Sequence, residues 1–126
     1  MKRCLFPGSF DPFTKGHEAI VHQALSLFDE VVIGVGINSK KQGLFSTDKK
    51  IAHIQALFTA QPNVKVASFQ KLTVEFCKEI GATQIVRGLR DAKDFEYERS
   101  IGHMNHAISG IDTVFFLTAQ VHSAIN

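Results

Sequence analysis

The stretch RCLFPGSFDPFTKGH, residues Arg3–His17, decides the fold class of this chain. Arg3–Pro7 is a short apolar run of the length of a buried strand, and a proline–glycine pair stops it. A loop over Gly8–Phe13 follows, and Thr14 is the expected N-cap of the next helix. Because a strand that leads through a short loop into a helix begins a β-α-β unit, the stretch predicts an α/β protein.

The same alternation of strand and helix patterns continues along the chain. Further strands are predicted over Val31–Ile37, Val64–Phe69, Gln84–Val86 and Thr113–Leu117. Helices are predicted over Lys15–Phe28, from Ser46-Thr47-Asp48 through Phe58, over Thr73–Ile80, and from Asp91 to about Ala107. Strands joined by helices require right-handed crossovers, so these patterns predict one doubly wound parallel sheet of about five strands, with a Rossmann-like fold. Ligands bind such a sheet at the carboxyl ends of its strands, near the switch in strand order.

Composition and charge predict a single soluble domain. The chain has 126 residues without a linker or internal repeat, so residues 1–126 are expected to form one domain. A formal net charge of +2, with acids and bases interleaved, argues against the broad basic face of a nucleic-acid binder. No apolar run reaches the roughly 18 residues that a membrane span needs, and a cytoplasmic protein is expected. Cys4 and Cys77 lack CxxC spacing, and free thiols are favoured over a disulfide between them.

The first loop, Gly8–His17, carries residues suited to bind phosphate. It matches neither the P-loop nor the GxGxxG pattern, yet it leads into a helix N-terminus, where backbone N–H groups and the helix dipole favour an anion. Gly8 lets the backbone approach a ligand, and Ser9 adds a hydroxyl donor. His17 falls in the first helical turn, where the dipole disfavours its cation. Either as a neutral donor or as a cation paired to phosphate, it could stabilise developing charge. A surface histidine that merely begins a helix is the alternative.

Two further basic segments are expected at the same edge of the sheet. Lys40-Lys41 follows the second strand directly, and one of these lysines is expected to reach the phosphate site. Arg87 and Arg90 follow the fourth strand, and paired guanidinium groups suit phosphate oxygens. A surface network in which Arg90 pairs with Asp94 and Glu98 is the alternative. The two interpretations are compatible, because an acidic partner also orients an arginine.

The remaining histidines show no metal-ligand spacing, so no metal site is predicted. His103 and His106 lie one helical turn apart, but no third ligand accompanies them. The same long helix carries apolar residues that are predicted to belong to the core, namely Phe95, Ile101, Met104 and Ile108.

Taken together, these motifs resemble a known family. The stretch FPGSFDPFTKGH resembles the HxGH-type signature of the nucleotidyltransferase superfamily, with Thr14 in place of the first histidine. The Thr-x-Gly-His form, the stretch RGLRDAKDFEYE and the HMN at His103–Asn105 look like the bacterial phosphopantetheine adenylyltransferases. The resemblance covers essentially the whole chain in order. RGLRDAKDFEYE distinguishes this family from relatives that act on nicotinamide mononucleotide or on cytidylyl groups.

The resemblance implies transfer of AMP from ATP to 4′-phosphopantetheine, which gives dephospho-coenzyme A and pyrophosphate in coenzyme A synthesis. It also implies Mg²⁺ with ATP, a homohexamer, and coenzyme A as a feedback ligand. His17 would stabilise the transition state at the α-phosphorus. The residues implied for phosphopantetheine are Ser9, Lys41, Thr73 and Arg87. Those implied for ATP are Ser9, Phe10, His17, Gly88, Leu89, Arg90, Glu98, His122, Ser123, Ala124, Ile125 and Asn126.

The last residues of the chain depart from the family pattern. Family chains continue with an Ile-Ser-Ser-Ser/Thr-like turn and a further helix, and the ATP triphosphate lies partly on the N–H groups of that turn. Asn126 stands where the first of those serines would be. The resemblance therefore implies a domain that lacks the family's C-terminal helix, with weak or absent activity for the chain as written.

Other functions remain compatible with the residues alone. A related nucleotidyltransferase could act on nicotinamide mononucleotide or another phosphate acceptor, and a non-catalytic nucleotide-binding module would carry the same loops. A flavodoxin-like electron carrier is disfavoured, because the first loop has Asp11-Pro12 and Gly16-His17 instead of a phosphate loop rich in serine and threonine.

Overall fold

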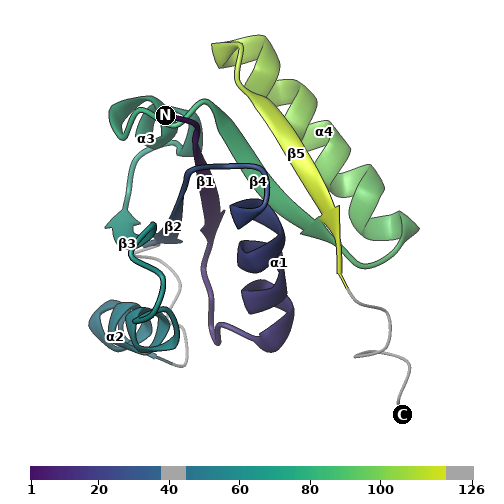
Figure 1. Ribbon diagram of the computed structural model, residues 1–126. Coiled ribbons are helices and arrows are strands. Elements are labelled where there is room, and N and C mark those ends of the chain that lie inside the picture. Colours follow the sequence, from purple (N-terminus) through teal and green to yellow (C-terminus); the bar gives the residue numbers. More distant parts are fainter. Residues whose placement is uncertain (38–44, 119–126) are drawn as a thin grey trace.

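Strands and helices alternate along the whole described chain (Figure 1). The computed structural model describes residues 1–37 and 45–118. The strands are β1 (Arg3–Gly8), β2 (Glu30–Gly36), β3 (Val64–Phe69), β4 (Gln84–Leu89) and β5 (Asp112–Leu117). The helices are α1 (Lys15–Leu25), α2 (Thr47–Leu57), α3 (Thr73–Glu79) and α4 (Ala92–Ser109). Every predicted strand and helix is present, so the predicted α/β class is confirmed.

The strands form one parallel sheet in the order β3-β2-β1-β4-β5. The chain moves outward from β1 to β3, returns to the other side of β1 with β4, and ends with β5. The switch in strand order therefore falls between β1 and β4, as in doubly wound sheets that bind ligands there. Within the described ranges, the registered pairs between β1 and β4 end where Leu5 meets Ile85, whereas β1 stays paired with β2 as far as Gly8.

Both faces of the sheet are covered, because successive side chains of a strand point to opposite faces. On one face, Leu5, Val32 and Ile85 lie in register on adjacent strands and pack with α3. The opposite face packs with α1 and α2 through a larger cluster that includes Phe6, Ile33, Val86, Ile20, Val21 and Ile54. α4 lies on the α3 face, since Gly102 is close to Thr113, which is in register with Ile85.

The predicted core residues of α4 are wrong: Met104 and Ile108 face away from the sheet. Phe95 lies edge-on to Phe115 of β5, and Ile101 lines a cavity beside the sheet, but neither is buried. The side of α4 toward the sheet carries Glu98, Gly102 and Asn105. The apolar residues are exposed, at 43% for Phe95, 37% for Ile101, 62% for Met104 and 64% for Ile108. Apolar spacing locates a stripe on a helix but does not say which side meets the sheet. None of the helices in the described ranges is long and apolar enough to cross a membrane.

β4 is longer than predicted, and this difference positions a site residue. The expected strand ended at Val86, but β4 continues to Leu89 because its last residues pair with β5. Arg87 therefore lies within the strand, in register with Phe115, and it shares a face with Ile85. Strand alternation thus directs the Arg87 side chain toward the α4 side of the sheet.

Helix boundaries follow the expected capping residues. Thr14, Ser46 and Asp91 are the N-caps of α1, α2 and α4, and each side chain accepts a hydrogen bond from the backbone N–H three residues on. α1 ends at Leu25, before the predicted Phe28. α3 also begins at the predicted Thr73, although no side chain caps it.

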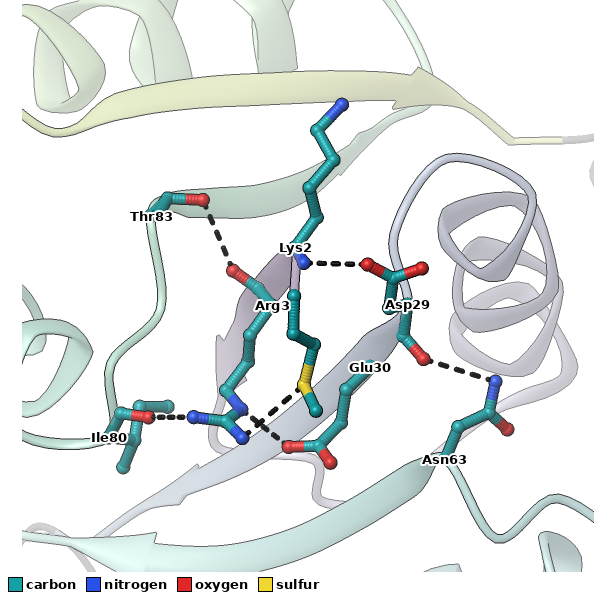
Figure 2. A network of polar contacts seen from close by, with 8 residues as sticks. Lys2, Arg3, Asp29, Glu30, Asn63, Ile80 and Thr83 are labelled. Carbon is teal, nitrogen blue, oxygen red and sulfur yellow. Dashed lines mark hydrogen bonds and ion pairs between the residues drawn. The ribbon is translucent and has the colours of Figure 1, made fainter.

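A polar network joins the amino ends of the strands, at the edge of the sheet opposite its carboxyl ends (Figure 2). Arg3 of β1 donates from Nε to Glu30 at the start of β2 and from Nη1 to the carbonyl oxygen of Ile80 after α3. The backbone N–H of Lys2 donates to Asp29 Oδ2 at 2.7 Å. One arginine thus holds β1, β2 and the α3–β4 connection together.

Cys4 and Cys77 are free and fully buried, as predicted. Burial raises the pKa of the Cys4 thiol to about 12, with a further contribution from Cys77, and burial raises the pKa of Cys77 to about 11. Both thiols are therefore protonated near neutral pH and behave as small core residues.

Replacing Arg3 with alanine is expected to lower the free energy of unfolding by about 2 kcal/mol, because Glu30 and the Ile80 carbonyl both lose their donor. Chemical denaturation measures this loss. Lys2→Ala is the matched control, since the contact of Lys2 with Asp29 uses the backbone N–H. Equal stability of the two variants would contradict the role assigned to Arg3.

Candidate active site

Two cavities meet at the carboxyl end of β1, at the switch in strand order. The first, of about 380 Å³, is named the Thr73 cavity, and the second, of about 450 Å³, is named the His17 cavity. Residues that line both cavities form a shared wall, which consists of Pro7, Gly8, Ser9, Arg87 and Glu98. A ligand group at this wall is within reach of both cavities.

The two cavities offer different chemistry. The Thr73 cavity lies among the ends of β2 and β3, the start of α3 and the inner side of α4, and its apolar lining includes Ile37, Phe69 and Ile101. The His17 cavity lies between the first loop and the β4–α4 connection, and its polar lining includes Thr14, His17 and Arg90. The first suits a partly apolar arm, and the second suits a charged ligand.

His17 is held by a reciprocal pair of hydrogen bonds at the start of α1. Its backbone N–H donates to Thr14 Oγ1 at 3.3 Å, and the backbone N–H of Thr14 donates to His17 Nδ1 at 2.9 Å. This is a capping box in which histidine takes the place of the usual glutamate or glutamine. Because Nδ1 accepts a hydrogen bond, the neutral imidazole carries its proton on Nε2.

Three phenylalanine rings surround the His17 imidazole. The ring centroids of Phe6, Phe10 and Phe13 lie 6.1, 5.1 and 5.3 Å from that of His17. Burial lowers the pKa of His17, and the positive charges of Arg87 and Arg90 lower it further. The predicted preference for neutral histidine is therefore supported, although burial is the leading cause rather than the helix dipole. In the ligand-free protein these causes favour the neutral imidazole, and the bond from Thr14 to Nδ1 leaves Nε2–H as the donor.

The first loop folds the Phe10 ring back over the end of β1. A Cβ atom on Gly8 would lie 2.9 Å from Phe10 Cζ, so a larger residue at this position would displace the ring. Phe10 itself has φ of 48°, in the left-handed region that favours glycine, and its ring is buried. This backbone arrangement leaves Ser9 exposed on the shared wall.

Arg87 bridges β1 and α4 across the shared wall. Its Nε and Nη2 donate to Glu98 Oε1 and Oε2 at 2.8 and 2.9 Å, and its Nη1 donates to the carbonyl oxygen of Pro7 at 2.6 Å. Glu98 is 9% exposed, and among the described residues it is the one charged side chain that is buried. The sequence alternative that paired Glu98 with Arg90 is wrong, because β4 extends past Val86 and turns Arg87 toward α4.

Arg90 lies at the exposed rim of the His17 cavity. Its Nε donates to Asp94 Oδ2 at 3.1 Å, and its backbone N–H donates to the same oxygen at 3.3 Å. The hydrogen bond and the charge of Asp94 raise the pKa of Arg90. The predicted pairing of Arg90 with Asp94 is confirmed, and it keeps the guanidinium beside the cavity.

The structure brings together most of the predicted site residues that it describes. Ser9, Phe10, His17, Arg87, Gly88, Arg90 and Glu98 line the His17 cavity, and Ser9, Thr73, Arg87 and Glu98 line the Thr73 cavity. Leu89 lines neither: its side chain is buried and its carbonyl oxygen accepts from Thr118. Lys41 and the predicted ATP residues His122, Ser123, Ala124, Ile125 and Asn126 lie outside the described residues.

Residues on the inner side of α4 were missed by the sequence analysis as parts of a site. Gly102 and Asn105 line the Thr73 cavity together with Thr113 of β5. Thr113 Oγ1 is a buried oxygen for which the described residues provide no hydrogen-bond partner. Gly102 and Asn105 follow Glu98 at steps of four and three residues, and residues at this spacing share a helix face. This spacing is the sequence signal that could have found them.

The arrangement suits the joining of two anionic ligands. Ser9 and Arg87 place donors at the junction of the cavities, and His17 and Arg90 add donors along the His17 cavity. The contacts of these described residues place none of them as a nucleophile activated by a base. The described residues contain no group of three His, Cys, Asp or Glu side chains that could hold a metal ion. This chemistry is positioning and charge stabilisation without a covalent enzyme intermediate.

In the free protein, His17 is expected to be the Nε2–H tautomer. Its imidazole is expected to gain a second proton only below its ordinary pKa of about 6.5. Protonation at Nδ1 would break the bond from Thr14 and place a cation among phenylalanine rings. Long-range ¹H–¹⁵N spectra over pH 5–8 measure both properties, with His17→Ala identifying the signal. An Nδ1–H tautomer, or titration above pH 6.5, would contradict this assignment.

Comparison with known proteins places the chain among nucleotidyltransferases. Residues 5–125 match a family described as cytidylyltransferase-like. Phosphopantetheine adenylyltransferase of Flavobacterium psychrophilum is 44% identical over all of this chain, which covers 83% of that relative. Phosphopantetheine adenylyltransferase of Leuconostoc citreum is 50% identical over all of this chain, which covers 80% of that relative.

Solved structures share the fold. A bifunctional NMN adenylyltransferase/ADP ribose pyrophosphatase from Francisella tularensis, solved with AMP and a manganese ion, matches 94% of this chain and 38% of its own, with a TM-score of 0.66 and 18% identity. Such a likeness supports the Rossmann-like nucleotidyltransferase fold alone. Together with the closer sequence relatives, it leads to the conclusion that this chain belongs to the cytidylyltransferase-like family and, within it, to the phosphopantetheine adenylyltransferases.

Proposed function

We propose that this protein transfers the adenylyl group of ATP to the phosphate of 4′-phosphopantetheine, giving dephospho-coenzyme A and pyrophosphate. The observation that carries the proposal is the shared wall, where an apolar-lined cavity and a polar cavity meet beside Arg87. The sequence relatives named phosphopantetheine adenylyltransferase support the same activity.

The reaction needs no group from the enzyme to form a bond with substrate. A phosphate oxygen of phosphopantetheine attacks the α-phosphorus of ATP, the new P–O bond forms, and the bond to the β-phosphate oxygen breaks as pyrophosphate leaves with its electron pair. The obstacles are the repulsion between two anions and their alignment. Positioning and electrostatic stabilisation overcome both.

Phosphopantetheine is proposed to occupy the Thr73 cavity, with its phosphate at the shared wall. Ser9 and Arg87 line that wall, and Thr73 lies at the start of α3. The apolar lining from Ile37, Phe69 and Ile101 suits the uncharged pantetheine arm. Lys41 is proposed to add a further positive charge to the phosphate.

ATP is proposed to occupy the His17 cavity. Phe10, Gly88 and Arg90 line this cavity, and a Cβ atom on Gly88 would lie 2.1 Å from Ile20 Cδ1, so the backbone here has no room for a side chain. Leu89 is proposed to contribute through its backbone. The remaining proposed ATP contacts are Ser9 and the segment His122, Ser123, Ala124, Ile125 and Asn126.

His17 is proposed to stabilise the charge that develops on the α-phosphate. As a neutral Nε2–H donor it needs no proton transfer to act, and its capping box with Thr14 fixes the ring before substrate binds. Preorganisation of this kind favours the transition state over the ground state.

Mg²⁺ is proposed to arrive as part of its ATP complex, as a component of the substrate. Mg²⁺ commonly binds substrate phosphates and water with few protein ligands. The carboxylates of Asp94 and Glu98 in the His17 cavity already accept hydrogen bonds from Arg90 and Arg87. The free thiols of Cys4 and Cys77 agree with a reducing compartment, and the cytoplasm is the proposed location.

The full-length protein is expected to release pyrophosphate only when ATP, Mg²⁺ and 4′-phosphopantetheine are all present. His17→Ala is expected to lower turnover about 10²–10³-fold with little change in ATP affinity, as for loss of one transition-state donor. A coupled pyrophosphate assay measures both. Nicotinamide mononucleotide replaces phosphopantetheine as the control acceptor; faster release with that acceptor, or near-normal turnover without His17, would refute the proposal.

We further propose that the protein assembles as a homohexamer. The outer stripe of α4, defined as Tyr97, Met104 and Ile108, presents apolar side chains at helical spacing, all of them exposed in the single chain. Exposed apolar surface of this kind commonly marks a protein–protein interface. A second copy of the chain is the proposed partner of the stripe.

Light scattering after size exclusion is expected to give the protein a mass six times that of the chain. Met104→Glu is expected to reduce this mass, because burying an unpaired charge opposes association. Lys93→Glu, an exposed charge change on the same helix outside the outer stripe, is the control. A monomeric wild-type protein, or an unchanged mass in Met104→Glu, would contradict the proposed role of the stripe.

Coenzyme A is proposed as a feedback ligand. It contains both the pantetheine arm and the adenylyl group, so it can place one part in each cavity and compete with both substrates. The continuity of the two cavities at the shared wall supports this proposal.

A further inference from the structure

We propose that Phe13 is a positioning residue for His17, and that its ring holds the plane of the imidazole from outside both substrate cavities. The inference rests on the proposed function, in which His17 Nε2–H stabilises the charge that develops on the α-phosphate. Such a donor is effective only when it points to the place where that charge develops.

The first argument is that the capping box alone does not orient the imidazole. The backbone N–H of Thr14 donates to His17 Nδ1 at 2.9 Å. One hydrogen bond at Nδ1 still lets the ring turn about its χ2 angle, which is broadly distributed for histidine. Packing against the ring is therefore needed to set the direction of Nε2–H.

The second argument is that Phe13 supplies this packing from an unusual place in the helix cap. The residue before an N-cap commonly packs on an apolar residue at the fourth helical position. In α1 that position is Glu18, and Phe13 packs on His17 instead, with ring centroids 5.3 Å apart and planes inclined by 38°. The Phe13 ring is 6% exposed and also contacts Phe58 at the end of α2, with centroids 6.0 Å apart. Contact with α2 thus fixes the ring that packs on His17.

The third argument is that Phe13 can act without touching substrate. It lines neither the Thr73 cavity nor the His17 cavity. Phe6 and Phe10, the other two rings around the imidazole, both line the His17 cavity. Of the three rings, Phe13 is therefore the one whose removal changes the support of His17 without removing a substrate contact.

The charged groups around His17 do not involve Phe13. The titratable side chains that line the His17 cavity together with the imidazole are Asp11, Arg87, Arg90, Asp94 and Glu98. Arg87 pairs with Glu98, and Arg90 pairs with Asp94. Burial is the leading cause of the lowered pKa of His17, and the Phe13 ring contributes to that burial. A change in the pKa of His17 in a Phe13 variant therefore reports the loss of the ring.

Phe13→Ala is expected to lower kcat about 10-fold, while KM for ATP and KM for 4′-phosphopantetheine each change less than about twofold, because the donor is misaligned and the substrate contacts remain. In the free variant the pKa of His17 is expected to rise toward its ordinary value of about 6.5, because water reaches the imidazole. The coupled pyrophosphate assay and long-range ¹H–¹⁵N spectra measure these changes.

Two further variants separate positioning from a general loss of packing. Phe13→Leu keeps much of the apolar volume and is expected to retain most of the turnover and the lowered pKa of His17. Phe28→Ala is the matched control, because Phe28 is 7% exposed in the same core cluster and lies beyond the C-terminal end of α1. It is expected to lower the melting temperature without changing kcat or the pKa of His17. Should Phe13→Ala fail to fold, Phe13→Val takes its place.

A double-mutant cycle completes the test. In a His17→Ala background, Phe13→Ala is expected to cause no further loss of kcat, since Phe13 acts through the imidazole. A further loss would overturn the inference, and so would an unchanged kcat or an unchanged pKa of His17 in Phe13→Ala alone. Absence of adenylyl transfer in the wild-type protein would instead overturn the proposed function. The two failures are distinguishable, because the pKa of His17 is measured without substrate.

Discussion

The site depends on how the parallel pairing of β1 with β4 ends. Their registered pairs stop where Leu5 meets Ile85, before either strand ends, and the link between the strands then passes to the Arg87 side chain, which donates to the Pro7 carbonyl oxygen. The two cavities share this junction. A sheet paired to its full length would leave no common wall, whereas a side-chain link holds the strands and still offers donors to a ligand.

Charges around the junction are balanced before any ligand binds. Arg87 and Arg90 pair with Glu98 and Asp94, two carboxylates that lie one helical turn apart on α4, and burial lowers the pKa of His17. Unpaired buried charges are costly, so this balance stabilises the folded protein. It also fixes the donors in advance, which matters for a reaction limited by the alignment of two anions.

The elements that local chemistry determines were predictable from the sequence. Strand and helix patterns, the N-caps at Thr14, Ser46 and Asp91, and the phosphate-suited first loop all follow from neighbouring residues. The partner of Glu98 could not be predicted from neighbouring residues, because its pairing with Arg87 depends on the extension of β4 along β5. The burial that lowers the pKa of His17 likewise comes from rings brought together only by the folded loop.

α4 shows why the hydrophobic pattern alone does not predict which side of a helix packs against the sheet. In an ordinary amphipathic helix the apolar stripe meets the sheet. Here the inner side carries Glu98, Gly102 and Asn105, which line the site, and the outer stripe carries Tyr97, Met104 and Ile108. A helix that must place a carboxylate against Arg87 cannot also use that side for a dry core. Its apolar surface is therefore available to another copy of the chain, so one helix connects the geometry of the site to the proposed assembly.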